Sequence, residues 1–208
     1  MLKAVLFDMD GVLVDTESFY NNRRAAYLAS ALPTYDGPWD FAGSNDRAIW
    51  ETIVPDDIEL RTRLHAGYDA YRATHREDYA ALLNPDAPAT LKALKARGLM
   101  VGIASSSSVD MIERMLQETG LKSLVDTYVS GCDMPRHKPA PDVYLACMEQ
   151  LGVLPAECAV VEDSPTGIEA GRASGACVIA LSQFVQSGTD QSAADVVISR
   201  LAALAEVL

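Results

Sequence analysis

Two carboxylates, Asp8 and Asp10, follow directly after the short apolar run from Ala4 to Phe7. In an extended chain, residues two positions apart point to the same side, so both acids could face one substrate or one metal ion. Gly11 then permits the tight backbone turn that a loop around a ligand needs. A solvated turn after an edge strand would use the same residue types, so this segment alone leaves both interpretations open. Acids in this arrangement suit a phosphate-transfer site.

A second pair of acids, Glu162 and Asp163, ends another apolar run. Ser164 is a good N-cap and Pro165 suits the first position of a helix, so these acids should lie in the loop just before a helix. Acidic residues at that place could simply favour the helix dipole. Combined with the first pair, they form the oxygen-rich set of ligands that Mg2+ prefers. The sequence therefore predicts Mg2+ as a cofactor.

Hydroxyls and a lysine supply the remaining chemistry. The serines from Ser105 to Ser108 stand between an apolar run and a helical pattern, where hydroxyls and backbone N–H groups form a natural anion site. Serine runs are also common in ordinary loops. Lys138 lies in a loop that Pro139 and Pro141 stiffen, and it could direct its ammonium at a phosphate oxygen or at the nucleophile. It could equally be a solvated surface charge, and His137 precedes it.

Short apolar runs recur along the chain with helical patterns between them, which suits strands covered on both faces of a parallel sheet. This alternation predicts an α/β fold with a Rossmann-like core. We expect strands at Ala4–Phe7, Met100–Ala104, Cys158–Val161, Ala176–Leu181 and Val196–Ile198, and helices near Pro88–Arg97, Val109–Thr119, Asp142–Leu151, Pro165–Ser174 and Leu201–Val207. Gly167, Gly171 and Gly175 recur on one helix face, which predicts close packing of that helix on the sheet.

A helical insertion interrupts this rhythm after the first strand. No convincing strand occurs there, and helical patterns run over Phe19–Ala31, Arg47–Ile53 and Leu60–Leu82. We therefore expect an α/β core domain at 1–16 and 85–208 and a helical cap domain at 17–84. Inserted at the carboxyl end of the first strand, the cap would lie over the edge where open α/β sheets bind ligands.

Composition limits the partners. The chain has 208 residues and a net charge of -12, which argues against nucleic acid or an anionic membrane surface as a partner. No apolar stretch approaches the roughly 20 residues that span a bilayer, and no signal peptide is evident. We expect a soluble, cytoplasmic monomer. No C-x-x-C occurs among Cys132, Cys147, Cys158 and Cys177, so we expect buried reduced thiols.

Taken together, the motifs resemble the haloacid dehalogenase superfamily of phosphotransferases. They occur in the family's order: Asp8 to Gly11, then Ser105, then Lys138 to Asp142, then Glu162 to Ser164. The chain is most similar to the β-phosphoglucomutase and phosphoglycolate phosphatase branch, whose helical cap is inserted after the first strand. The resemblance covers essentially the whole core.

The resemblance implies a role for each motif. Asp8 would attack phosphorus and form an aspartyl-phosphate, and Asp10 would act as general acid and then as general base. Asp8, the backbone carbonyl of Asp10, and Asp163 would bind Mg2+, with Glu162 as a closer or water-mediated partner. Phosphoryl oxygens would be held by Ser105, Ser106 and Lys138. The function expected is hydrolysis of a small phosphorylated metabolite.

Two departures from the mutase pattern bear on that function. Phe19-Tyr20-Asn21-Asn22 stands where a mutase would carry a catalytic histidine, and the first cap loop keeps Gly43 but places Arg47 later than that branch does. A phosphosugar mutase is therefore the alternative enzyme. A non-catalytic regulatory protein of the same fold is the alternative of another class. A dinucleotide enzyme is disfavoured because no G-x-G-x-x-G follows the first strand.

Overall fold

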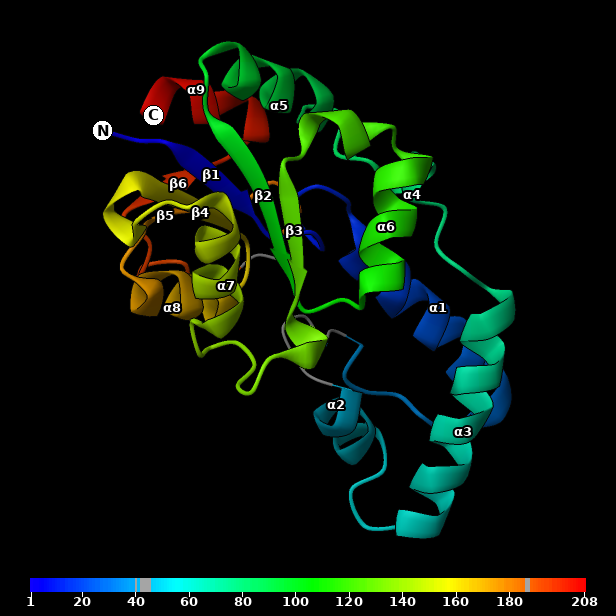
Figure 1. Ribbon diagram of the computed structural model, residues 1–208. Coiled ribbons are helices and arrows are strands. Elements are labelled where there is room, and N and C mark those ends of the chain that lie inside the picture. Colours follow the sequence, from blue (N-terminus) through cyan, green and yellow to red (C-terminus); the bar gives the residue numbers. More distant parts are fainter. Residues whose placement is uncertain (40, 42–45, 186–187) are drawn as a thin grey trace. The chain divides into compact units, whose positions relative to one another are not determined.

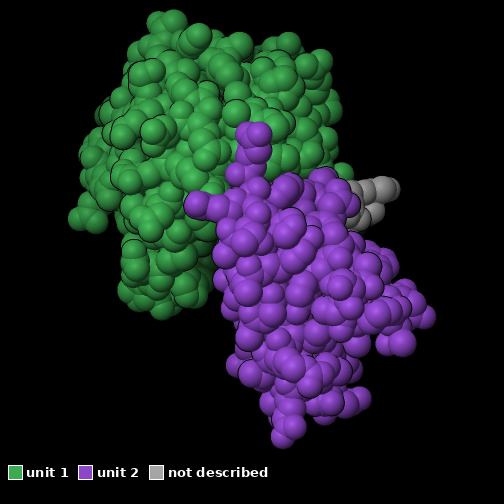
Figure 2. Space-filling view, turned by 90° about the vertical axis from the view of Figure 1, so that its right-hand side faces the viewer, with its two compact units in different colours: residues 1–15, 79–208 green, residues 16–78 purple. Residues whose placement is uncertain are grey.

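The computed structural model describes residues 1–39, 41, 46–185 and 188–208. The chain divides into two compact units, a core unit of residues 1–15 and 79–208 and a helical unit of residues 16–78 (Figure 2). The division after residue 78 comes earlier than the cap boundary that we expected after Asn84. The reason is that α4 (Tyr79–Leu82) belongs to the core unit, where Leu83 forms a bridge with Val14.

A six-stranded parallel sheet forms the centre of the core unit in the described part of the chain (Figure 1). Its order is β3-β2-β1-β4-β5-β6, so the first strand lies in the middle. The strands are β1 (Ala4–Phe7), β2 (Met100–Ser105), β3 (Thr127–Ser130), β4 (Cys158–Glu162), β5 (Cys177–Leu181) and β6 (Val196–Ile198). The expected α/β fold is confirmed.

Helices cover both faces of this sheet because successive strand residues alternate between the two faces. Val5 and Phe7 of β1 pack in one buried cluster with residues of α5 (Ala87–Ala96), α6 (Val109–Glu118) and α9 (Leu204–Val207). Ala4 and Leu6 pack in another with residues of α7 (Asp142–Leu151) and α8 (Pro165–Ser174). Covered on both sides, the middle strands carry the continuous apolar runs seen in the sequence.

Strand β3 was not predicted from the sequence. β3 reads Thr-Tyr-Val-Ser and, among the described strands, pairs with β2 alone, at the lateral edge of the sheet. Its first two residues are only partly buried, so it lacks the apolar run by which the other strands were recognised. Short 3-10 turns complete the core unit at Leu121–Leu124, Gly131–Asp133, Pro155–Glu157 and Leu201–Ala203.

The helical unit comprises α1 (Thr16–Ala31), α2 (Asp46–Ile53) and α3 (Ile58–Thr74). Its own apolar cluster includes Leu28, Trp50, Leu64 and Tyr68. The helix expected over Leu60–Leu82 was right as far as Thr74 and wrong beyond it, because the chain leaves helical geometry there and the last turn of that pattern is α4 of the core unit. Gly43 of the first cap loop lies outside the described residues.

Two further findings concern surface and solvent. Within the residues that the structure describes, no helix is both long enough and apolar enough to cross a membrane. All four cysteines are free thiols, but only Cys147 and Cys158 are buried. The expectation of buried thiols was wrong for Cys132, which lies in the turn after β3, and for Cys177, which begins β5 at the rim of the sheet.

Candidate active site

The candidate residues come from the carboxyl ends of neighbouring strands. Asp8 directly follows β1, Ser105 is the last residue of β2, and Glu162 is the last residue of β4. Because β2 and β4 flank β1 in parallel, these three positions lie side by side at the carboxyl end of the sheet. The Asp8 backbone N–H continues the ladder by donating to the Val161 carbonyl at 3.0 Å.

Lys138 contacts residues at the carboxyl ends of β1, β2 and β4. Its Nζ lies 2.6 Å from Asp8 Oδ1, 2.7 Å from Glu162 Oε1 and 3.1 Å from the Ala104 carbonyl oxygen. These three contacts account for all three hydrogens of the ammonium group. The side chain is only 8% exposed, so it is not the solvated surface charge considered from the sequence. A hydrogen bond of His137 fixes the loop that carries Lys138: His137 Nδ1 lies 2.9 Å from the Gly131 carbonyl oxygen.

Glu162 is held from both sides. Its Oε1 accepts hydrogen bonds from Lys138 Nζ and from the Tyr144 hydroxyl, both at 2.7 Å. Its Oε2 accepts from the Asp163 backbone N–H at 3.0 Å and from the N–H and hydroxyl of Ser164 at 3.3 Å. A carboxylate offers about four acceptor positions, and most of those of Glu162 accept from these protein donors. We therefore expect Glu162 to reach a metal ion through water.

The three glycines in and just after α8 are required for three different structural reasons. A Cβ at Gly167 would lie 1.8 Å from Glu162 Oε1, so this glycine makes room for the buried carboxylate. A Cβ at Gly171 would lie 2.9 Å from Val178 Cγ2, which is the close packing on the sheet that we expected. Gly175 ends the helix in a left-handed conformation with φ of +85°. The packing explanation therefore holds for Gly171 and, against Glu162 at the end of β4, for Gly167, but not for Gly175.

The donor set fits a hard divalent cation. Asp8, Glu162 and Asp163 each offer a carboxylate oxygen, and these atoms lie within 4.8 Å of one another. Asp163 packs so closely on Gly11 that a Cβ there would lie 2.0 Å from Asp163 Oδ2. Oxygen ligands in small number, with room for water and phosphate, are what Mg2+ prefers. Asp10 is not among the three residues of this group, and its backbone carbonyl remains a proposed ligand.

Serine side chains fix the loop after β2. Ser105 is 1% exposed and its Oγ accepts from the Ser107 backbone N–H at 3.0 Å. Ser107 Oγ donates to Asp10 Oδ2 at 2.8 Å. Ser108 caps α6 by accepting from the Met111 N–H, whereas Ser106 is exposed. Sequence reasoning named the serine run but not the contact of Ser107 with Asp10, because a separation of 97 residues leaves no local signal.

Burial sets the charges at this edge. It raises the pKa of Asp8 to about 8, and repulsion from Glu162 and Asp10 adds to this effect while the Lys138 ammonium opposes it. Burial alone would lower the pKa of Lys138, but Asp8 and Glu162 outweigh it and raise this pKa well above its usual value. Burial also opposes the charge of Glu162, yet Lys138 and the hydrogen bonds lower that pKa. The net effect is a raised pKa of Asp8, which a cation bound beside this carboxyl would lower.

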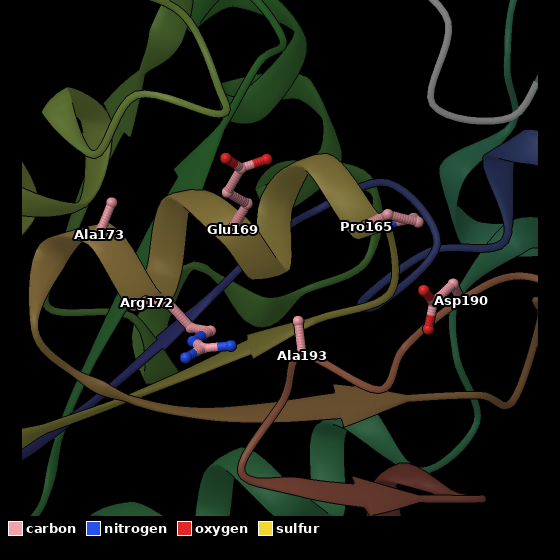
Figure 3. A pocket seen from close by; sticks show the side chains of 6 residues that line it. All are labelled: Pro165, Glu169, Arg172, Ala173, Asp190 and Ala193. Atoms are coloured by element: carbon pink, nitrogen blue, oxygen red, sulfur yellow. The ribbon is translucent and has the colours of Figure 1, made fainter.

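A separate surface pocket of about 580 Å3 lies beside α8 (Figure 3). Its lining residues are Pro165, Glu169, Arg172, Ala173, Asp190 and Ala193. None of the candidate catalytic or metal-binding residues is among them. The pocket is therefore not the candidate active site.

Comparisons with known proteins agree with this geometry. Residues 2–175 match the family model of haloacid dehalogenase-like hydrolases. The chain is 32% identical over 180 residues to the fructose-1-phosphate phosphatase YqaB of Escherichia coli (strain K12), covering 83% of this chain and 92% of that protein. It is 30% identical over 178 residues to the phosphorylated carbohydrates phosphatase of Thermotoga maritima, covering 84% of this chain and 82% of that protein.

Among solved structures, the β-phosphoglucomutase of Clostridium difficile shares the fold, with a TM-score of 0.75, 21% identity, and coverage of 98% of this chain and 93% of that one. The resemblance inferred from the motifs is confirmed. The chain therefore belongs to the haloacid dehalogenase-like hydrolases.

Proposed function

We propose that this phosphatase hydrolyses a small phosphorylated metabolite, a sugar phosphate or similar phosphomonoester, through an aspartyl-phosphate on Asp8. The observation that carries the proposal is the contact of Asp8 with a buried Lys138 at the carboxyl edge of the sheet. A carboxylate in this position can act as a nucleophile, and the ammonium beside it can hold the oxygens of the incoming phosphoryl group.

In the first step, a carboxylate oxygen of Asp8 attacks phosphorus and the bond to the leaving alcohol breaks. Asp10 gives its proton to the departing oxygen, because an alkoxide is a poor leaving group. In the second step, Asp10 takes a proton from a water molecule that attacks the same phosphorus. The acyl phosphate bond then breaks, which releases inorganic phosphate and restores the Asp8 carboxylate.

The hydrogen bond from Ser107 to Asp10 supports this division of roles. With Oδ2 of Asp10 bound to the Ser107 hydroxyl, the acid is held beside the loop that carries Ser105. We propose that Ser105 and Lys138 hold the phosphoryl oxygens, with the exposed Ser106 at the mouth of the same loop. Preorganised donors of this kind stabilise charge that develops in the transition state.

Mg2+ would be held by Asp8, the backbone carbonyl of Asp10, and Asp163, with Glu162 bound through water. When bound, the ion neutralises phosphate charge that would otherwise repel the Asp8 carboxylate. The carboxylate oxygens gathered within 4.8 Å support this assignment.

The names of the relatives support the substrate class. A fructose-1-phosphate phosphatase, a phosphorylated carbohydrates phosphatase and a hexitol phosphatase all align over more than four fifths of this chain. We propose that the helical unit acts as the cap that supplies specificity. Arg47 is a weak candidate for a substrate contact, because it is 86% exposed and pairs with Glu51 at 2.8 Å.

A screen of phosphorylated metabolites with Mg2+ and phosphate release as the readout tests this function. We expect turnover of one or a few sugar phosphates, and no release from any phosphomonoester would support the non-catalytic alternative. To test the mutase alternative, β-glucose 1-phosphate is supplied with glucose 1,6-bisphosphate. Because Phe19-Tyr20-Asn21-Asn22 stands where a mutase carries histidine, we expect phosphate release rather than glucose 6-phosphate, and efficient isomerisation would contradict the proposal.

A further inference from the structure

Tyr144 is a completely buried residue whose hydroxyl reaches the candidate active site. It lies in the first turn of α7, just after the loop that carries Lys138, and none of its surface is exposed. Its ring belongs to the apolar cluster between the sheet and α7, together with Leu6, Ala104 and Val160. Phenylalanine could fill that space, so packing does not explain the hydroxyl. A buried phenol needs a hydrogen-bond partner, and the partner identifies what the group does.

That partner is Glu162. The Tyr144 hydroxyl donates to Glu162 Oε1 at 2.7 Å, and Lys138 Nζ donates to the same oxygen at the same distance. An ionised carboxylate only accepts, so the phenol must be the donor. Burial beside Glu162 raises the pKa of Tyr144 well above its usual value, which keeps the hydroxyl protonated.

The ring of Tyr144 contacts Lys138 as well. Nζ of Lys138 lies 4.8 Å from the ring centroid, within the range of a cation–π interaction. Tyr144 thus contacts Lys138 through its ring. Through its hydroxyl it also donates to Glu162, which accepts from Lys138. The ammonium group has a second acceptor in Asp8, the proposed nucleophile. A small movement of Glu162 would therefore shift Lys138 relative to Asp8.

We propose that Tyr144 is a positioning residue, whose hydroxyl fixes Glu162 Oε1 so that Lys138 stays directed at Asp8 and the phosphoryl group. This inference rests on the proposed function, and it adds a residue that does not touch substrate. The consequence is a specific kinetic signature. Loss of the hydroxyl misplaces Lys138, which acts in the transition state, so it lowers kcat more than it raises KM.

The test is a double-mutant cycle of Tyr144→Phe and Lys138→Ala, with p-nitrophenyl phosphate as substrate and saturating Mg2+. Tyr144→Phe keeps the ring and its contact with Lys138. We expect kcat to fall about tenfold, as for the loss of one hydrogen bond to a charged group, with KM changed less than about threefold. In the Lys138→Ala background, the same change should lower kcat by less than about twofold, because the hydroxyl then has no lysine to position.

Tyr79→Phe is the matched control. Tyr79 is also completely buried in the core unit, but its ring lies under Arg114, 4.7 Å from the guanidinium carbon. We expect this change to leave kcat unaltered. An unchanged kcat in folded Tyr144→Phe would overturn the inference, as would the same fold loss in both lysine backgrounds. Asp8→Asn separates the two claims, since its loss of turnover supports the proposed function whatever Tyr144 does.

Thermal denaturation checks that each variant folds. If Tyr144→Phe does not fold, 3-fluorotyrosine incorporated at position 144 keeps the ring and hydroxyl but changes the strength of the hydrogen bond. A changed kcat with the folded state retained would then support the inference. An unchanged kcat would contradict it.

Discussion

At the scale of single residues, Lys138 and Glu162 can both be buried because each pairs with the other. A buried ammonium is tolerated only when it is paired and hydrogen-bonded, and Lys138 has two carboxylates and a carbonyl within 3.1 Å. Glu162 satisfies the same requirement with donors on both oxygens. The pair therefore forms a hydrogen-bonded support beside Asp8, and in the proposed mechanism Asp10 is the acid that moves protons.

The role of Asp10 predicts a dependence on the leaving group. Asp10→Asn removes the proton that a sugar alcohol needs on departure, whereas an activated aryl oxide leaves without one. We expect kcat to fall by roughly 100-fold or more for a sugar phosphate, and by much less for p-nitrophenyl phosphate. Steady-state rates on both substrates measure this. Equal losses on the two substrates would contradict the assignment of Asp10 as general acid.

The raised pKa of Asp8 predicts that Mg2+ binding depends on pH. In the metal-free protein, Asp8 is mostly protonated below pH of about 8, so the ion must displace a proton. The apparent affinity for Mg2+ should rise by up to about tenfold per pH unit as pH increases towards 8, and level off above it. Calorimetric titration with Mg2+ at several pH values, at constant ionic strength, measures this dependence. Asp8→Asn should bind more weakly and lose the slope, and an unchanged slope in that variant would assign the proton elsewhere.

At the scale of elements, α8 follows the loop of the proposed metal ligand Asp163 and packs against Glu162, which supports Lys138. Ser164 caps this helix, and its first turn lies against Glu162 because Gly167 has no side chain. Gly167 and Gly171 of the same helix can therefore be compared by the same substitution. One faces the carboxylate, and the other faces the valines of the sheet.

Gly167→Ala and Gly171→Ala should separate activity from stability. Alanine favours helix by about 1 kcal/mol over glycine, so neither change is costly for the helix itself. The new methyl at 167 must displace Glu162 from its hydrogen bonds, so we expect kcat to fall at least tenfold. At 171 the methyl presses on Val178 and Val160, so the free energy of unfolding should fall by about 1 to 3 kcal/mol with kcat retained. The reverse pattern would show that Gly167 serves packing alone.

The strands of the middle of the sheet and the helices beside them could be predicted from sequence, because burial on both faces produces unbroken apolar runs. Edge strand β3 and the break after Thr74 could not, since the first lacks such a run and the second depends on which unit each helical turn packs in. At the site, motifs pointed to Asp8, Lys138 and Glu162. Ser107 and Tyr144 became apparent only from tertiary contacts, because neither stands in a pattern that differs from an ordinary loop or core helix.

At the scale of the whole molecule, charge and division into two units limit what the protein can process. Each unit has its own apolar cluster, and the chain as a whole carries a net charge of -12. Such a surface repels polyanions, so the positive charge of the site must act over short distances on a small ligand. This agrees with a small phosphomonoester as substrate.

We therefore expect measurable phosphate release from sugar phosphates and negligible release from a folded phosphoprotein or from 5'-phosphorylated duplex DNA. All substrates are compared at equal concentrations of phosphomonoester, with the same enzyme and Mg2+. Release from the two macromolecules at a rate within about tenfold of the sugar phosphate would contradict both the charge argument and the proposed cap.

The central claim is that the carboxylate of Asp8 is the nucleophile, and Asp8→Asn tests it most directly. The amide has nearly the same shape but cannot attack phosphorus, so the variant should fold and lose phosphatase activity. Phosphate release by purified wild-type protein and Asp8→Asn is compared in saturating Mg2+, with circular dichroism to establish that both are folded. We expect turnover reduced to background in the variant. Substantial turnover by folded Asp8→Asn would contradict it.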